Sequence, residues 1–233
     1  MKIELQPIGY INSPYHEKFA TPRQPGLVSQ AQGYVELVSP YNQADSVAGL
    51  ETCSHIWIEF VFHEVMNQGW KPKVRPPRLG GNEKMGVFAT RSTHRPNPIG
   101  LSVVKLDRID INNGVRLWIS GLDLIDGTPV VDIKPYVPYS DCLPDAQYPF
   151  AQDKPPAIDV IFSQACETRL NNQPQLKTFL LQVLEQDPRP AFHKFDQERE
   201  YGAALMQHNV KWRYQKDDSG NISLYVESIT PLA

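Results

Sequence analysis

Hydrophobic and polar residues alternate along much of the first half of the chain, which is the spacing of β-strands that bury one face. The clearest run is HIWIEFVFH, residues 55–63, in which every second side chain is apolar. One face carries Ile56, Ile58, Phe60 and Phe62, and the other carries Trp57, Glu59 and Val61. Shorter alternations at residues 3–5 and 35–37 predict two further strands.

A β-hairpin is predicted between residues 100 and 125. The runs GLSVVKLDRIDI (100–111) and VRLWISGLDLI (115–125) flank Asn-Asn-Gly, and Asn-Gly accepts the positive φ angles of a tight turn. One short helix is indicated in this half, by NQADSVAGLE at residues 42–51. Several strands with few helices between them predict a closed or nearly closed antiparallel sheet, a small β-barrel.

The pattern changes after residue 140. The segment 141–157, DCLPDAQYPFAQDKPPA, is rich in proline and polar residues, as is typical of a linker. Beyond it, an amphipathic helix is predicted by apolar residues at helical spacing: Leu176, Phe179, Leu180, Val183 and Leu184. Strand patterns follow at 210–215 and 223–229. The sequence therefore predicts a mainly β protein, with a single-sheet barrel domain at residues 1–145 and a small α+β domain at 158–233.

The chain is rich in proline. Proline makes up 21 of the 233 residues, or roughly 9%, whereas its typical share is about 5%. Proline favours turns and short extended segments over helices.

The start of the chain lacks the apolar core of a signal peptide, and no apolar run is long enough to span a membrane. Cys53, Cys142 and Cys166 form no C-x-x-C pair, which predicts neither disulfides nor a zinc site. We expect a cytoplasmic protein without a membrane partner or a bound metal.

The formal net charge of −3 argues against a protein that binds nucleic acid over its whole surface, but the charge is uneven. Between residues 71 and 95 the only acidic residue is Glu83, and the basic residues are Lys71, Lys73, Arg75, Arg78, Lys84, Arg91 and Arg95. Pro96 and Pro98 stiffen the end of this segment, so Arg91 and Arg95 are presented to carboxylate or phosphate oxygens. In the alternative, the block is a solvated face and its arginines neutralise neighbouring carboxylates.

Two short motifs add candidate chemistry. His63 and Glu64 end the predicted strand at 55–62 and could bind a ligand or move a proton, although such residues often form only a surface pair. Gly26, after Pro25, allows the backbone to approach a ligand closely, or it forms an ordinary turn.

Acidic residues also gather in the stretch GLDLIDGTPVVDIKPYVP, residues 121–138: Asp123, Asp126 and Asp132 lie there with Lys134. Asp126 could simply cap the turn at Asp-Gly-Thr-Pro, and the cluster lacks the paired histidines of a typical metal site. The sequence also lacks G-x-G-x-x-G, the P-loop motif and G-x-S-x-G. Their absence argues against a doubly wound cofactor fold and against Walker-type nucleotide hydrolysis.

Three long stretches, in this order, resemble one family: SPYHEKFATPRQPGL, VRPPRLGGNEKMGVFATRSTHRPNPIGLS and LDLIDGTPVVDIKPYVP. This is the YaeB (TsaA-like, TrmO) family of S-adenosylmethionine-dependent tRNA methyltransferases, which methylate N6 of threonylcarbamoyladenosine at position 37 of the anticodon loop. The stretches cover most of residues 7–138, and QDPRPAF and HNVKWRY extend the resemblance into the second half. The resemblance implies this activity, with threonine tRNAs as substrates, a small β-barrel in place of a Rossmann fold, and a homodimer.

The resemblance also implies which residues bind the methyl donor: Gln24, Pro25, Gly26, His63, Glu64, Arg91, Leu101, Gly121, Leu122, Asp123 and Leu124. Arg91 suits the methionyl carboxylate of the donor, and Glu64 suits its amino group. The proton on N6 of the substrate must be accepted by a base, for which His63, Asp123 and Asp126 are the candidates.

The substrate base lies in a loop, where it can be turned out and stacked. Its threonyl carboxylate needs a cation, for which Arg95, also a predicted catalytic residue, and Lys134 are candidates. Lys73, Arg75 and Arg78 would follow the phosphates of the anticodon stem.

Two alternatives differ in class from a methyltransferase. One is a tRNA- or ligand-binding module without catalysis. The other is a metal-assisted hydrolase that uses His63, Glu64, Asp126 and Asp132.

Overall fold

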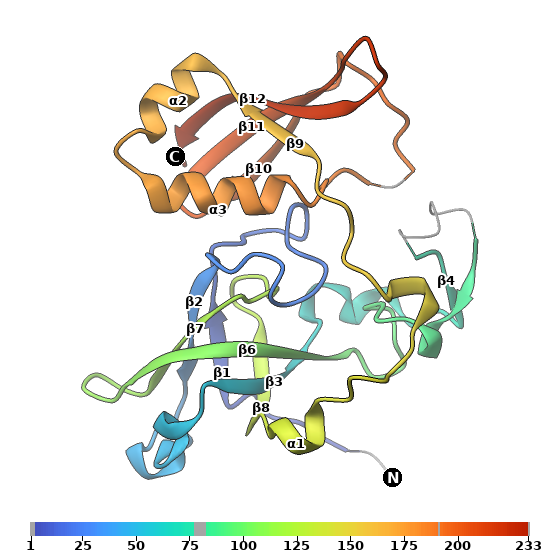
Figure 1. The fold of residues 1–233 in the computed structure, drawn as a ribbon. Helices are drawn as coiled ribbons and strands as arrows, with labels where there is room; N and C mark the ends of the chain where they lie inside the picture. Colours follow the sequence, from blue (N-terminus) through green and yellow to red (C-terminus); the bar gives the residue numbers. More distant parts are fainter. Residues whose placement is uncertain (1–2, 77–82, 191, 233) are drawn as a thin grey trace.

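The computed structural model describes residues 3–76, 83–190 and 192–232 and contains a closed, six-stranded antiparallel barrel (Figure 1). The strands are β1 (Gly9–Asn12), β2 (Gln32–Leu37), β3 (His55–Val61), β6 (Ile99–Asp110), β7 (Arg116–Ser120) and β8 (Pro129–Pro135). Their order around the barrel is β1-β2-β7-β6-β3-β8, and β8 pairs with β1 to close it. The predicted mainly β fold with a closed antiparallel sheet is confirmed.

The alternating apolar residues of the sequence fill the inside of this barrel. In β3, the side chains of Ile56, Ile58 and Phe60 are buried, and the residues between them lie on the other face. Val35 and Leu37 of β2 are buried in the same way. The periodicity therefore identified the inward face of both strands correctly.

The predicted strand at residues 3–5 is wrong. These residues form no strand, and Ile3 and Leu5 are 70% and 51% exposed. The reason is that β1 pairs with β2 on one side and with β8 on the other, so the closed barrel leaves no free edge here.

The predicted hairpin is present in the structure, whereas the predicted short helix takes a different form. The β6–β7 hairpin is present, and Gly114 in its turn has a φ of +89°. Residues 42–51, however, contain the 3-10 helix η1 (Ala44–Val47) and the start of a second, η2 (Leu50–Thr52), in place of one α-helix. Gly49 separates them with a left-handed φ of +88°, a conformation that ends a helical run.

Short elements follow β3 and lead into β6. The 3-10 helix η3 (His63–Gln68) comes directly after β3, and the two-residue strand β4 (Lys73–Val74) pairs with β5 (Met85–Gly86). The 3-10 helix η5 (Val87–Ala89) then begins the cationic loop, residues 87–98, which contains Arg91 and Arg95.

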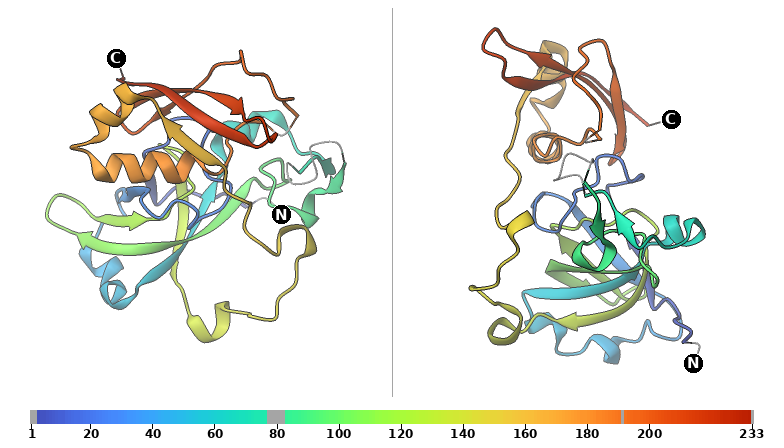
Figure 2. Two further views of the ribbon diagram at one scale, coloured as in Figure 1. Left: turned by 45° about the horizontal axis from the view of Figure 1, so that its top comes forward. Right: turned by 90° about the vertical axis from the view of Figure 1, so that its right-hand side faces the viewer.

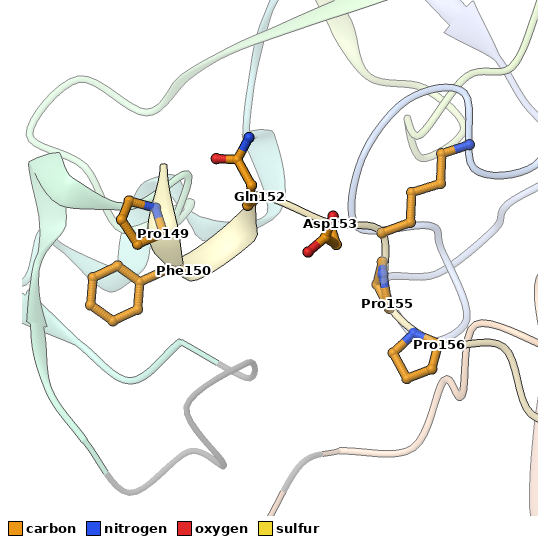
Figure 3. A pocket seen from close by; sticks show the side chains of 7 residues that line it. Pro149, Phe150, Gln152, Asp153, Pro155 and Pro156 are labelled. Carbon is orange, nitrogen blue, oxygen red and sulfur yellow. The ribbon is translucent and has the colours of Figure 1, made fainter. Parts of the chain in front are cut away.

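After β8 and the short helix α1 (Pro138–Asp141), the chain runs along the outside of the barrel toward the C-terminal region (Figures 1 and 2). This linker includes the 3-10 helix η6 (Pro149–Ala151), and the Tyr148 hydroxyl donates a hydrogen bond of 2.7 Å to the carbonyl oxygen of Ala89. A hollow of about 370 Å³ is lined by Pro149, Phe150, Gln152, Asp153, Lys154, Pro155 and Pro156 (Figure 3). None of these residues belongs to the predicted site.

The C-terminal region is α+β, as predicted. Its sheet has the order β10 (Tyr201–Leu205), β11 (His208–Lys216), β12 (Ile222–Pro231) and β9 (Asp159–Phe162), with β9 parallel to β12. The helices are α2 (Gln164–Leu170) and α3 (Pro174–Leu184), and all five apolar residues of the predicted amphipathic helix are buried in α3. Within the described ranges, no helix has the length and apolar character needed to cross a membrane.

The barrel and the C-terminal region share one hydrophobic core. The segment 13–31, between β1 and β2, lies against α3 and the C-terminal sheet (Figure 1). The ring of Tyr15 packs on that of Phe179 in α3, with 5.9 Å between centroids, and Phe19 stacks on Trp212 of β11 at 5.7 Å. This segment is therefore the main packing layer between the two regions.

Replacing Gly33 with alanine is expected to destabilise the barrel. Gly33 lies in β2, and a Cβ atom there would overlap the backbone carbonyl oxygen of Asn12 in β1. Because this oxygen belongs to a paired strand, we expect the free energy of unfolding to fall by about 1 to 3 kcal/mol, measured by urea denaturation. Gly86→Ala is the matched control, because a Cβ atom there meets nothing within 4 Å. Equal losses in the two variants would contradict this account.

Candidate functional site

The connection after β7 meets the loop before β2 at Gly121. The backbone N–H of Gly121 donates a hydrogen bond to the carbonyl oxygen of Ala31, and its own carbonyl oxygen accepts one from the N–H of Gly26, each at 2.8 Å. Gly26 and Gly121 have φ angles of +76° and +75°, which glycine adopts without the steric cost of a side chain. The predicted stretches 24–26 and 121–124 are thereby brought together.

Arg91 joins this arrangement from the cationic loop. Its Nη1 donates a hydrogen bond of 2.5 Å to Oε1 of Gln24. Its positive charge also acts on Asp123 and favours the carboxylate form of that residue. A guanidinium thus lies beside the two glycine turns, and its charge acts on a nearby carboxyl group, which suits a ligand that carries both a negative and a positive charge.

Asp123 is the residue of this group with the most perturbed acidity. Burial raises the pKa of its carboxyl group to about 6, although the Ser102 hydroxyl, the residue's own backbone N–H and Arg91 all favour the charged form. The Ser102 hydroxyl donates a hydrogen bond of 2.7 Å to Oδ1 of Asp123. A carboxyl group with this pKa is mostly ionised at neutral pH and can still take up a proton, which is typical of groups that move protons.

His63 and Glu64 lie where β3 passes into η3. The backbone N–H of Phe62 donates a hydrogen bond of 2.8 Å to the carbonyl oxygen of Pro98, which places the start of η3 beside the proline-stiffened loop. His63 is half-buried and Glu64 is exposed. The hydrolase alternative would need these residues in a ligand cluster, but among the residues that the structure describes no group of three or more His, Cys, Asp or Glu is arranged to hold a metal.

The other predicted donor-site residues differ in what they can present to a ligand. Leu101 is 50% exposed on the outer face of β6, whereas the next residue, Ser102, is buried and directed toward Asp123. Leu122 and Leu124 are buried in the core, so only their backbone groups can contact a ligand. Pro25 is half-buried next to Gly26.

Arg95 and Asp126 have contacts that shape loops. Nη1 of Arg95 donates hydrogen bonds to the carbonyl oxygens of Val87 and Thr90, at 3.2 and 2.7 Å. Oδ1 of Asp126 accepts the backbone N–H of Ser13 at 2.9 Å, which joins the turn at Asp126 to the segment after β1. The predicted catalytic roles of Arg95 and Asp126 stay predictions.

The residues predicted to contact tRNA are Lys73, Arg75, Arg78 and Lys134. The first two are exposed, in and just after β4, and Arg78 lies outside the described residues. Lys134 is ion-paired with Asp132 and, at 2.9 Å, with Glu59, and these carboxylates raise the pKa of its ammonium group. An anionic ligand would have to compete with both of them for Lys134.

Two residues near Asp123 were not identified from the sequence. Ser102 could have been found, because it is a polar residue at an inward position of the alternating strand 100–111. Tyr15 is the second residue, and no pattern in the sequence marks it. Its side chain is fully buried, and its hydroxyl has no hydrogen-bond partner among the described residues. Burial and the charge of Asp123 raise the pKa of this hydroxyl.

Family models match both parts of the chain. The model of the tRNA-methyltransferase O N-terminal domain matches residues 10–142, and that of the TrmO C-terminal domain matches residues 155–227. A tRNA (adenine(37)-N6)-methyltransferase of Escherichia coli (strain K12) is 54% identical, over 90% of this chain and 92% of that protein. An S-adenosyl-L-methionine-binding protein of Archaeoglobus fulgidus is 40% identical, over 60% of this chain and 93% of that protein. The crystal structure of TrmO from Pseudomonas aeruginosa matches with a TM-score of 0.80 at 39% identity, covering 100% of this chain and 98% of that one.

Asp123→Asn is expected to stabilise the protein at pH 7. The raised pKa of about 6 means that the stability contributed by the protonated Asp123 carboxyl is fully present below about pH 4 and is lost as the pH rises through 6. Asparagine can accept the Ser102 hydrogen bond without a buried charge. We therefore expect a gain of about 1 to 3 kcal/mol at pH 7 that shrinks toward zero near pH 4, measured by urea denaturation. Asp145→Asn, at an exposed linker position, is the control, and a gain independent of pH would contradict this account.

Proposed function

Since the chain belongs to the TrmO family, we propose that it is a tRNA (adenine(37)-N6)-methyltransferase that takes its methyl group from S-adenosylmethionine. The match to the E. coli enzyme, which extends over nearly all of both chains, supports this activity. We further propose that the methylated atom is N6 of threonylcarbamoyladenosine in the anticodon loop of threonine tRNAs.

The observation that carries the donor assignment is the hydrogen bond of Arg91 to Gln24 beside the bonded glycine turns at Gly26 and Gly121. S-adenosylmethionine has a carboxylate, an ammonium group and a sulfonium cation, and it supplies an activated methyl group when bound. Arg91 matches the carboxylate of the donor, and Glu64 is the acidic candidate for its ammonium group. The glycine turns allow the protein backbone to approach a ligand closely.

The proton on N6 of the substrate requires an acceptor, and among His63, Asp123 and Asp126 we favour Asp123. Its pKa of about 6 makes it a carboxylate at neutral pH and a stronger base than an ordinary aspartate. Asp126 is already bonded to the backbone of Ser13. Because methyl transfer needs donor and acceptor in line, the further contribution of the barrel is to hold both in a fixed orientation.

The exposed side chains of Lys73 and Arg75 are our candidates for the phosphates of the anticodon stem, together with Arg78. For the threonyl carboxylate of the substrate we favour Arg95 over Lys134, which is already paired with two carboxylates. The hydrogen bonds of Arg95 to described residues involve Nη1, so Nε and Nη2 are the groups that would bind the carboxylate.

We propose that the protein acts as a homodimer in the cytoplasm. Exposed apolar side chains occur in the segments around the site: Met66, Trp70, Phe88, Ile99 and Leu101. A second copy of the chain would cover these exposed apolar groups, as the partner does at a protein interface. The three cysteines are unpaired, which suits a reducing compartment.

Methylation of defined tRNAs tests the proposed function. The protein is incubated with S-adenosylmethionine and with threonine tRNA that carries or lacks the threonylcarbamoyl group at A37, and the nucleosides are analysed by mass. We expect one added methyl group, on threonylcarbamoyladenosine alone. Methylation of the unmodified adenosine would overturn the substrate assignment, and donor binding without transfer would favour the binding-module alternative.

Arg91→Ala is expected to weaken the binding of S-adenosylmethionine by at least about tenfold, because a charge-assisted hydrogen bond to the donor carboxylate is lost. Calorimetric titration measures the Kd. Arg199→Ala makes the same change at an exposed position of the C-terminal region and is the control. Unchanged donor binding in Arg91→Ala would remove Arg91 from the donor site.

Replacing Lys73 and Arg75 together with alanine is expected to weaken tRNA binding and to leave donor binding unchanged. The slope of log K against log salt concentration should fall by about 1 to 2, since each lost phosphate contact releases about one fewer counterion. Filter binding at several salt concentrations measures this slope. An unchanged slope would show that the two side chains do not contact phosphates.

A further inference from the structure

We infer that Gln182 of α3 is a positioning residue for the methyl-donor site, because it fixes the loop that carries Gln24, Pro25 and Gly26. The inference rests on the proposed function, since it concerns the same site. The loop, residues 13–31, contains no helix and no regular strand. Its conformation therefore depends on the surfaces against which it packs.

Gln182 bonds to the end of the loop that enters β2. Its Oε1 accepts the backbone N–H of Gln30 at 3.0 Å, and its Nε2 donates a hydrogen bond of 3.1 Å to the hydroxyl of Ser29. The side chain of Gln182 is half-buried, and its neighbours Val183 and Leu184 are anchored in the core. One amide group therefore fixes two consecutive loop residues to a rigid helix.

From Gln30 the constraint reaches the donor site through backbone hydrogen bonds. The next residue, Ala31, accepts the N–H of Gly121, and the carbonyl oxygen of Gly121 accepts the N–H of Gly26. A displacement of Gln30 would thus move both glycine turns. It would also disturb Asp123, which follows Gly121 by two residues.

The C-terminal region fixes the beginning of the loop as well. The backbone N–H of Met206 donates a hydrogen bond of 2.8 Å to the carbonyl oxygen of Pro14, and Nε2 of His16 lies 2.7 Å from the carbonyl oxygen of Met206. Phe19 stacks on Trp212. Both ends of the loop are therefore fixed to the C-terminal region, and the donor-binding residues lie between them.

Gln182→Met and Gln182→Glu separate this hydrogen bond from packing. Methionine keeps the length of the side chain but cannot accept the N–H of Gln30, whereas glutamate still accepts it. Gln182→Met removes the hydrogen bonds to both Gln30 and Ser29, and we expect the KM for S-adenosylmethionine to rise about tenfold with little change in kcat. Gln182→Glu should restore nearly the original KM. Gln175→Ala, at an exposed position of α3, is the control.

Amide hydrogen exchange of the donor-free protein gives a second readout. In Gln182→Met, the amides of Gln30 and Gly26 should exchange at least about tenfold faster, while those of β11 keep their protection. Unchanged KM and exchange rates in Gln182→Met would overturn the inference, as would an equal loss in Gln182→Glu. If the original protein bound no S-adenosylmethionine, the proposed function would fail, and the exchange rates would still decide whether Gln182 fixes the loop.

Discussion

The two backbone hydrogen bonds of Gly121 are the constraint on which the rest of the site depends. In the barrel, Gln32 of β2 pairs with Ser120 of β7, so the bond between Gly121 and Ala31 continues this ladder by one residue. The left-handed turn at Gly121 then directs the chain away from the ladder and toward Gly26. The position of the site is therefore set by the strand register, and a shift by one residue would separate the two loops.

The register of β6 against β3, in which Ser102 pairs with Ile58, influences the acidity of the site. It places Ser102 on the inner face of β6, where its hydroxyl meets Asp123 in surroundings that are mainly apolar. Removing a carboxylate from water costs free energy, and here one hydroxyl, one N–H and the charge of Arg91 do not fully offset that cost. The remaining cost appears as a raised pKa. Stability is thus lower, and basicity higher, at the point where the proposed reaction needs a proton acceptor.

Local patterns predicted the parts of the fold that local forces decide. Alternation identified the inward faces of β2 and β3, and helical spacing identified α3, because each pattern reports burial along one element. The prediction failed at residues 3–5 because barrel closure, a property of the whole sheet, left no edge for them. The site needed the family resemblance, since periodicity cannot place Arg91 beside Gln24, 67 positions away. The hydrogen bond between Gln182 and Gln30 joins residues that are more than twice as far apart in the sequence, and no local pattern predicts it.

Two basic side chains of the C-terminal sheet are paired with carboxylates, which supports our proposal that this region has a supporting role. Lys211 pairs with Glu200 at 2.8 Å, and Arg213 pairs with Glu227 at 2.9 Å. Basic groups that are already matched by carboxylates contribute little attraction to a polyanion, because binding would require the acidic partners to be displaced. The segment 71–95, by contrast, has a single acidic residue among its basic ones. We therefore propose that the barrel side attracts tRNA, while the C-terminal region keeps the loop 13–31 in the conformation that the proposed reaction requires.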